Sequence, residues 1–156
     1  MNKTLKEVSE LYNVIKVLKF NGVPADLRLR IIKLMRQLKP HAERLQSDVR
    51  DALERFKTDR YDDDEQAAAN LIGKPLTEEQ QLIFLRHNTD AKLMDKAAKD
   101  YLYGLFVNGK REGGVYSETV DVDIESFTES EITRIIEANA ELDTESCVVL
   151  LELIGE

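Results

Sequence analysis

The chain has 156 residues, of which 42 % are hydrophobic and 33 % charged, and its formal net charge is −8. This composition is typical of one soluble globular domain and excludes an intrinsically disordered chain. We expect no membrane span, because no apolar run approaches the ~20 residues that cross a bilayer, and no secretory signal, because residues 1–7 lack an apolar segment. The single cysteine, Cys147, excludes an internal disulfide, and we expect a buried, unreactive thiol in a cytoplasmic protein.

Charge is distributed unequally along the chain. Residues 1–60 hold 14 Lys and Arg against 8 Asp and Glu, whereas residues 61–156 hold 8 against 22. Because the summed field of a protein steers the partners that it meets, this division predicts association guided by charge. It is not a catalytic pattern.

The N-terminal part predicts an antiparallel helical hairpin. One apolar stripe ends before Gly22, and a second begins after Pro24 and runs over residues 27–56, which corresponds to a helix of about 45 Å. Pro40 predicts a kink in this helix or its division into two helices. We expect an exposed seam on the hairpin to pair two copies in a homodimer, in the manner of a coiled coil.

The middle of the chain predicts a linker followed by a third helix. Residues 58–76 are polar and contain a Gly-Lys-Pro breaker, so we expect a loop with one helical turn at residues 67–69. The third helix begins at Thr77 and has a break at residues 88–90, and its apolar positions include Leu82, Leu85, Leu93, Met94, Ala97, Tyr101, Leu102 and Leu105. The glycines of residues 108–114 predict a flexible turn.

The C-terminal part predicts one strand and two short helices. Val120, Val122 and Ile124 alternate with acidic residues, as in a half-buried strand, whose pairing partner is either residues 115–116 or a second copy of the chain. Phe127 and Ile132 have the spacing of a hydrophobic staple around the next helix start. The last helix follows residue 143 and ends at residue 155.

Helix starts are marked by three capping boxes, in which a Thr side chain and a Glu or Gln side chain three residues later each accept from the other residue's backbone. The pairs are Thr4 with Glu7, Thr77 with Gln80, and Thr128 with Glu131. The sequence therefore predicts a mainly α fold: an N-terminal antiparallel helical hairpin with a long second helix, a third packed helix, and a small C-terminal strand-plus-helix unit. We expect segments 1–60, 61–115 and 116–156 to form one compact domain.

Four stretches together form one pattern of hydrophobicity: Leu11-Tyr12 to Gly22-Val23 with the helix that follows, Val120 to Ile124, Leu142 to Glu145, and Leu150 to Ile154. In this pattern the chain resembles small helical proteins of unknown function that are encoded by tailed bacteriophages and prophages. The resemblance implies a phage-encoded protein, located in the host cytoplasm or in the virion. It implies no functional residue, because the shared pattern is one of hydrophobicity.

Acidic runs and two histidines are the residues that could form a metal or catalytic site. The run Asp62 to Glu65 lacks the glycine of a calcium loop, so a solvated loop or a charge-favoured helix start is the better interpretation. The alternating acids at 121, 123 and 125 would share one strand face, and we interpret them as solvated. His41 and His87 lie far apart in sequence, and we interpret them as structural or surface residues. We therefore predict no catalytic residue, metal or cofactor.

A basic row on the second helix is the one cluster that suggests a partner. Its members are Arg28, Arg30, Lys33, Arg36, Lys39 and Arg44. Packing against the acidic part of the chain or against another protein explains the row better than a phosphate backbone, because no stacking aromatic or base-reading module accompanies it. We predict a non-enzymatic interaction protein, an assembly or adaptor factor that docks through its helical hairpin. The alternatives are a nucleic-acid-associated protein that uses the basic row, and an acidic decoy in which residues 118–145 imitate a phosphate backbone.

Overall fold

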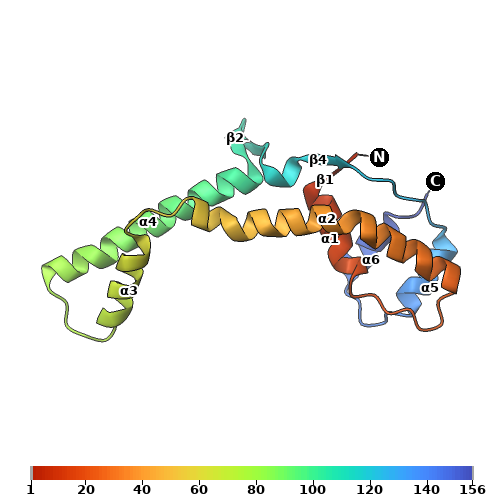
Figure 1. Cartoon of the computed structure of the whole chain (residues 1–156), viewed down its shortest axis with the longest axis horizontal. Coiled ribbons are helices and arrows are strands. Elements are labelled where there is room, and N and C mark those ends of the chain that lie inside the picture. Colours follow the sequence, from red (N-terminus) through yellow and green to blue (C-terminus); the bar gives the residue numbers. More distant parts are fainter. Residues whose placement is uncertain (1, 156) are drawn as a thin grey trace. The chain divides into compact units, whose positions relative to one another are not determined.

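The computed structural model describes residues 2–155 and is mainly helical, with two small antiparallel strand pairs (Figure 1). The helices are α1 (Leu5–Ile15), α2 (Ala25–Arg55), α3 (Tyr61–Leu71), α4 (Glu78–Tyr103), α5 (Glu129–Glu137) and α6 (Thr144–Leu151). The strands are β1 (Asn2–Thr4), β2 (Leu105–Val107), β3 (Lys110–Glu112) and β4 (Thr119–Asp121), and a 3₁₀ turn spans Val115–Ser117. The predicted fold class, mainly α with a small strand unit, is confirmed.

The chain forms two compact units. The terminal unit contains residues 1–46 and 116–156, and the middle unit contains residues 47–115. One boundary lies between residues 115 and 116. The other boundary lies inside α2, which runs from one unit into the other.

All three predicted capping boxes are present, and α1, α4 and α5 begin at the predicted residues. In each, the Thr hydroxyl accepts from the backbone N–H three residues on, and the Glu or Gln side chain accepts from the Thr backbone N–H. Asp143 caps α6 in a similar way, its carboxylate accepting from the Ser146 N–H at 2.7 Å. These starts are predictable because every contact is local.

The core of the terminal unit is built from both ends of the chain. It joins α1 and the first half of α2 to the C-terminal helices, and its buried members include Leu11, Ile15, Leu27, Ile31, Leu34, Leu38, Ile132, Ile135 and Leu150. In Figure 1, α1 crosses α2 obliquely. The apolar stripe expected to form a seam between copies therefore lies mostly inside this core, covered by α5 and α6 of the same chain. Phe127 and Ile132, the predicted staple, are both buried there.

The predicted C-terminal strand pairs with the N-terminus. β4 lies antiparallel to β1, with Asn2 opposite Asp121 and Thr4 opposite Thr119. Both predicted partners, residues 115–116 and a second copy, are therefore wrong. The alternation itself is confirmed, because Val122 is buried and Val120 and Ile124 are half-buried against the core, whereas Asp121, Asp123 and Glu125 are exposed.

Two predicted helix interruptions do not occur. α2 continues through Pro40 as one 31-residue helix, so its division into two is wrong. Proline removes one backbone donor, but Leu38 and Ala42 on either side are buried and stabilise the helix through packing. α4 continues through residues 88–90, because the buried Asp90 is paired with Arg60 and not used to end the helix.

The predicted linker is wrong, because residues 61–71 form α3, which packs on α4. Three aspartates occupy its first turn, where the positive end of the helix dipole favours them. The alternative of a charge-favoured helix start is thus confirmed for Asp62, Asp63 and Asp64. The third of these, Asp64, also accepts two hydrogen bonds from Arg86 on α4, a tertiary contact that no local pattern reveals.

The predicted flexible turn is a β-hairpin. β2 and β3 are joined by Asn108 and Gly109, both with positive φ (52° and 79°), as in the type I′ turn of two-residue hairpins. The base of the hairpin requires Gly104, whose φ is 93°. A Cβ at this position would lie 2.0 Å from the Glu112 backbone oxygen.

Candidate interaction surfaces

Arg30 is held within the terminal unit by four contacts. Its guanidinium donates to the Glu125 carboxylate (Nε to Oε2, 3.0 Å), to the Ser126 carbonyl oxygen (2.9 Å) and to the Glu131 carboxylate. It also lies over the Phe127 ring, 4.4 Å from the centroid. The residue therefore joins α2 to the segment that leads into α5, and it is not available to an external phosphate.

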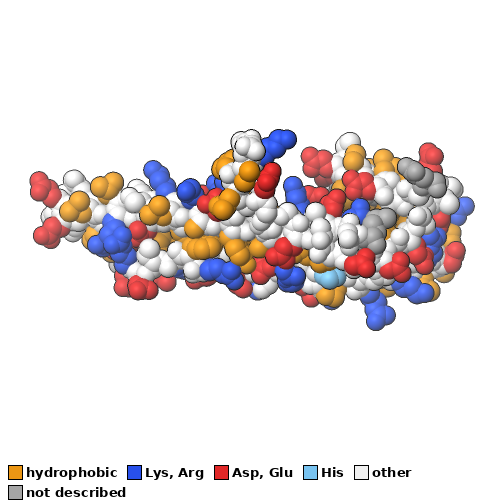
Figure 2. Space-filling model, turned by 90° about the horizontal axis from the view of Figure 1, so that it is seen from above, with side chains coloured by type: hydrophobic (Ala, Val, Ile, Leu, Met, Phe, Trp, Pro, Cys, Tyr) orange, Lys and Arg blue, Asp and Glu red, His pale blue; other side chains and the backbone are white. Residues whose placement is uncertain are grey.

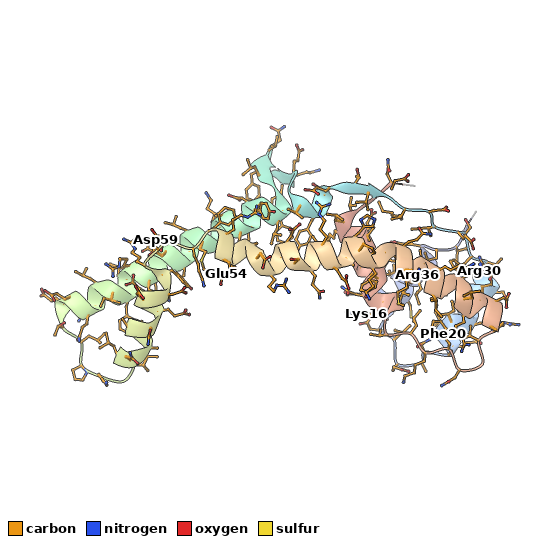
Figure 3. The ribbon with its side chains drawn as sticks, in the orientation of Figure 1. Lys16, Phe20, Arg30, Arg36, Glu54 and Asp59 are labelled. Carbon is orange, nitrogen blue, oxygen red and sulfur yellow. The ribbon has the colours of Figure 1, made fainter. Side chains whose placement is uncertain are left out.

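The rest of the basic row is divided between paired and exposed residues. Arg44 pairs with Glu118, and Lys39 lies 3.8 Å from Glu43 on the same helix. Arg28, Lys33 and Arg36 are exposed. Figure 3 shows Arg30 and Arg36 on the same part of α2, although only Arg30 takes part in the ion-pair network. The acidic segment thus neutralises two of the six cations internally.

The alternating acids of residues 121–125 are likewise integrated into the terminal unit. Glu125 pairs with Arg30, and the Asp123 backbone N–H donates to the Gln37 side chain at 3.0 Å. Within residues 2–155, no group of three or more His, Cys, Asp or Glu side chains could hold a metal ion.

Glu131 connects the capping box of α5 to the basic row. It accepts from the Thr128 backbone N–H at 3.0 Å and from Arg30. The Thr128 bond and the nearby guanidinium hold the pKa of the Glu131 carboxyl below its ordinary value, because both favour the charged form. The negative charge of Glu131 therefore stabilises the fold through its contacts with Thr128 and Arg30.

A cavity of about 270 Å³ opens in the terminal unit between α1, the end of α6 and residues 124–126. Apolar and charged side chains both line it. The apolar ones include Val8, Leu11, Leu38, Val149 and Leu153, and the charged ones are Lys3, Glu7, Glu125 and Glu152. No side chain of the predicted basic row lines this cavity.

Two buried carboxylates join the helices of the middle unit. Asp90 on α4 accepts from Arg60 (2.8 and 3.0 Å) and from the Thr58 hydroxyl (3.3 Å), and Asp64 on α3 accepts from Arg86. Each arginine lowers the pKa of its partner carboxyl by hydrogen bonding to the charged form. These two reciprocal pairs fix α3 against α4.

The two histidines and the cysteine occupy separate surroundings. His87 is half-buried, its ring centroid lies 4.8 Å from that of Tyr61, and its Nδ1 has no hydrogen-bond partner. His41 is half-buried on α2. Cys147 on α6 is half-buried too, whereas full burial was predicted. The structure does not bring these residues together.

The β2–β3 hairpin of the middle unit exposes consecutive apolar side chains. Leu105, Phe106 and Val107 are 64 %, 66 % and 44 % exposed. Successive side chains of a strand point to opposite faces, so both faces of this hairpin are uncovered. Figure 2 shows hydrophobic side chains on this hairpin. The Asn-Gly dipeptide is a hairpin signal that sequence reasoning could have used.

α4 carries a second exposed apolar surface. Its predicted apolar positions lie on two faces: Met94 and Leu102 are buried, whereas Leu82, Leu85 and Leu93 are exposed. Figure 2 shows separate hydrophobic side chains along this helix.

No protein-family model, curated protein or solved structure matches the chain. None of the helices within residues 2–155 is long and apolar enough to cross a membrane.

Proposed function

We propose that the chain is a non-enzymatic interaction protein of the assembly or adaptor type, and that it docks into an apolar groove of a partner protein through the β2–β3 hairpin. The observation that carries this proposal is the exposure of Leu105, Phe106 and Val107 on both faces of the hairpin. Contiguous apolar surface of this kind marks binding sites, because its burial removes apolar area from water.

Arg111 anchors the hairpin to the end of α4. Arg111 donates to the Asp100 carboxylate (3.0 Å) and to the Gly104 carbonyl oxygen (2.9 Å), and its guanidinium lies over the Phe106 ring at 4.4 Å. A surface fixed in one conformation loses less entropy on binding. This supports a docking role for the hairpin over that of a mobile loop.

The predicted docking through the N-terminal helical hairpin has less support. Most of its apolar stripe lies in the core of the terminal unit, although Val17, Leu29 and Ile32 remain exposed. The acidic-decoy alternative is also weakened, because Glu118, Glu125 and Glu131 form ion pairs within the chain.

The test is affinity capture with cross-linking from a lysate of the source cells. The double variant Leu105→Ser/Phe106→Ser should lose the proteins captured by the wild type, while the control Ile72→Ser should retain them, since Ile72 is 73 % exposed elsewhere in the middle unit. Circular dichroism checks that both variants are folded. Capture of the same proteins by all three chains would overturn the proposal.

Nucleic-acid binding is the second candidate, supported by the exposure of Arg28, Lys33 and Arg36. Binding to random duplex DNA should then be present at low salt and weaken steeply as salt rises, because phosphate contacts release counterions. Absence of binding at low salt would exclude it.

A further inference from the structure

We propose that the outer face of α4 pairs with the same face of a second copy of the chain, antiparallel and about a two-fold axis. The face is formed by six residues: Glu78, Leu82, Leu85, Thr89, Leu93 and Lys96. We call these six residues the α4 stripe. The proposal concerns a surface distinct from the β2–β3 hairpin.

The stripe lies on one side of the helix. Its positions step by 4, 3, 4, 4 and 3 residues, which keeps them on one face over about 27 Å of α-helix. All six side chains are exposed, and the three leucines are 61 %, 63 % and 61 % exposed. The opposite side of α4 carries Met94, Ala98 and Leu102, which are buried. α4 thus uses one face inside the middle unit and leaves the other without cover.

Charge complementarity identifies the occupant. Glu78 stands at one end of the stripe and Lys96 at the other, and neither forms an ion pair with any residue in the described part of the chain. An antiparallel copy places Glu78 beside Lys96 of the second chain, and Lys96 beside the second chain's Glu78. A parallel copy would instead place like charges together, at a cost in binding free energy.

The apolar positions match in the same arrangement. When residue 78 faces residue 96, the axis lies near residue 87, so Leu85 faces Thr89 of the second copy and Leu82 lies within one residue, about 1.5 Å of helix rise, of Leu93 of the second copy. To within one residue, the stripe is therefore complementary to itself read in reverse, as an isologous two-fold interface requires. A helix that binds an unrelated protein needs no such match.

The first test is the oligomeric state of the full chain, measured by sedimentation velocity across a concentration series. The wild type should show a monomer–dimer equilibrium. Leu82→Ser/Leu93→Ser should raise the dimer dissociation constant at least about tenfold, because it removes the leucine layers, and the exposed control Ile72→Ser should leave it unchanged. A wild type that stays monomeric throughout, or a dimer that both variants affect equally, would overturn the proposal.

The second test decides the direction of pairing. Glu78→Lys and Lys96→Glu should each weaken the dimer about three- to tenfold, because each places like charges at both ends of the interface, and the double variant should restore wild-type affinity. Failure of the double variant to restore affinity would overturn antiparallel pairing. The hairpin variant Leu105→Ser/Phe106→Ser should dimerise like the wild type, so failure of the hairpin proposal is distinguished from failure of this one.

Discussion

Asn139 should be one of the most important polar residues for the stability of the terminal unit. It follows α5, is 2 % exposed, and forms three hydrogen bonds through its side-chain amide. The Lys19 N–H donates to its Oδ1 at 2.6 Å, and its Nδ2 donates to the carbonyl oxygens of Lys19 (2.9 Å) and Ile135 (2.8 Å). The side chain thus links the end of α5 to the segment after α1, 120 positions away.

We expect Asn139→Ala to lower the free energy of unfolding by about 2–5 kcal/mol. The part-buried N–H and carbonyl of Lys19 lose their partner, and the buried hydrogen bond to the Ile135 carbonyl is lost too. An unsatisfied buried polar group costs roughly 1–3 kcal/mol. Urea unfolding followed by circular dichroism measures the change, and amide exchange in the peptide that contains Lys19 should accelerate. The control is Asn70→Ala on the exposed surface of α3, which should change stability by less than about 0.5 kcal/mol.

A pH series provides the result that would refute this reasoning. In Asn139→Asp, a carboxylate would face the two carbonyl oxygens, so its folded-state pKa should be raised above the unfolded value. The protonated acid can donate to a carbonyl, so this variant should gain stability relative to Asn139→Ala as pH falls through the raised pKa. Two results would refute the role of Asn139 in stability. One is an Asn139→Ala variant as stable as the wild type, and the other is an Asn139→Asp variant whose stability relative to Asn139→Ala does not change with pH.

Three further predictions concern other parts of the fold. Glu131→Gln should lower the free energy of unfolding by about 1 kcal/mol at neutral pH. In thermal unfolding at a series of pH values, this difference should vanish as pH falls through the lowered folded-state pKa of Glu131, because the wild-type carboxylate then loses its charge too. Gly104→Ala should destabilise the hairpin base by at least about 2 kcal/mol in urea unfolding, because of positive φ and backbone overlap. Asp64→Asn should lower the melting temperature and accelerate amide exchange in α3, whereas the exposed Asp63→Asn, which loses only its interaction with the helix dipole, should have a smaller effect on both.

Local chemistry explains which elements the sequence predicts well. The capping boxes at Thr4, Thr77 and Thr128 involve only residues three apart, so the sequence contains the whole interaction. The period of two at Val120 and Val122 likewise identifies an extended segment without any knowledge of its partner.

Long-range contacts explain the errors. α3 depends on the pairing of Asp64 with Arg86, and β1 is a three-residue strand that exists because β4 lies beside it. Neither contact has a signature in the neighbouring sequence. The apolar stripe of the N-terminal helices likewise predicts pairing with a second copy. The helices that cover this stripe, α5 and α6, lie about a hundred residues further along the chain, so the local sequence does not reveal them.

The functional predictions show the same limit. Charge alone identified the basic row, but the structure was needed to show that Arg30 and Arg44 bind acids of their own chain while Arg36 remains exposed. The exposed leucines of α4 were recognised as apolar positions, but their separation from the buried face depends on where α3 packs. The phage origin stays a prediction.

The position of the unit boundary inside α2 has a consequence for how the chain can be divided. In a continuous α-helix, each backbone N–H donates to the carbonyl four residues earlier. The amides of residues 47–50 therefore donate to the carbonyls of residues 43–46 within one uninterrupted helix. A cut between residues 46 and 47 would leave both sets of backbone groups without their helical partners. A fragment that begins or ends at this boundary therefore loses a turn of α2.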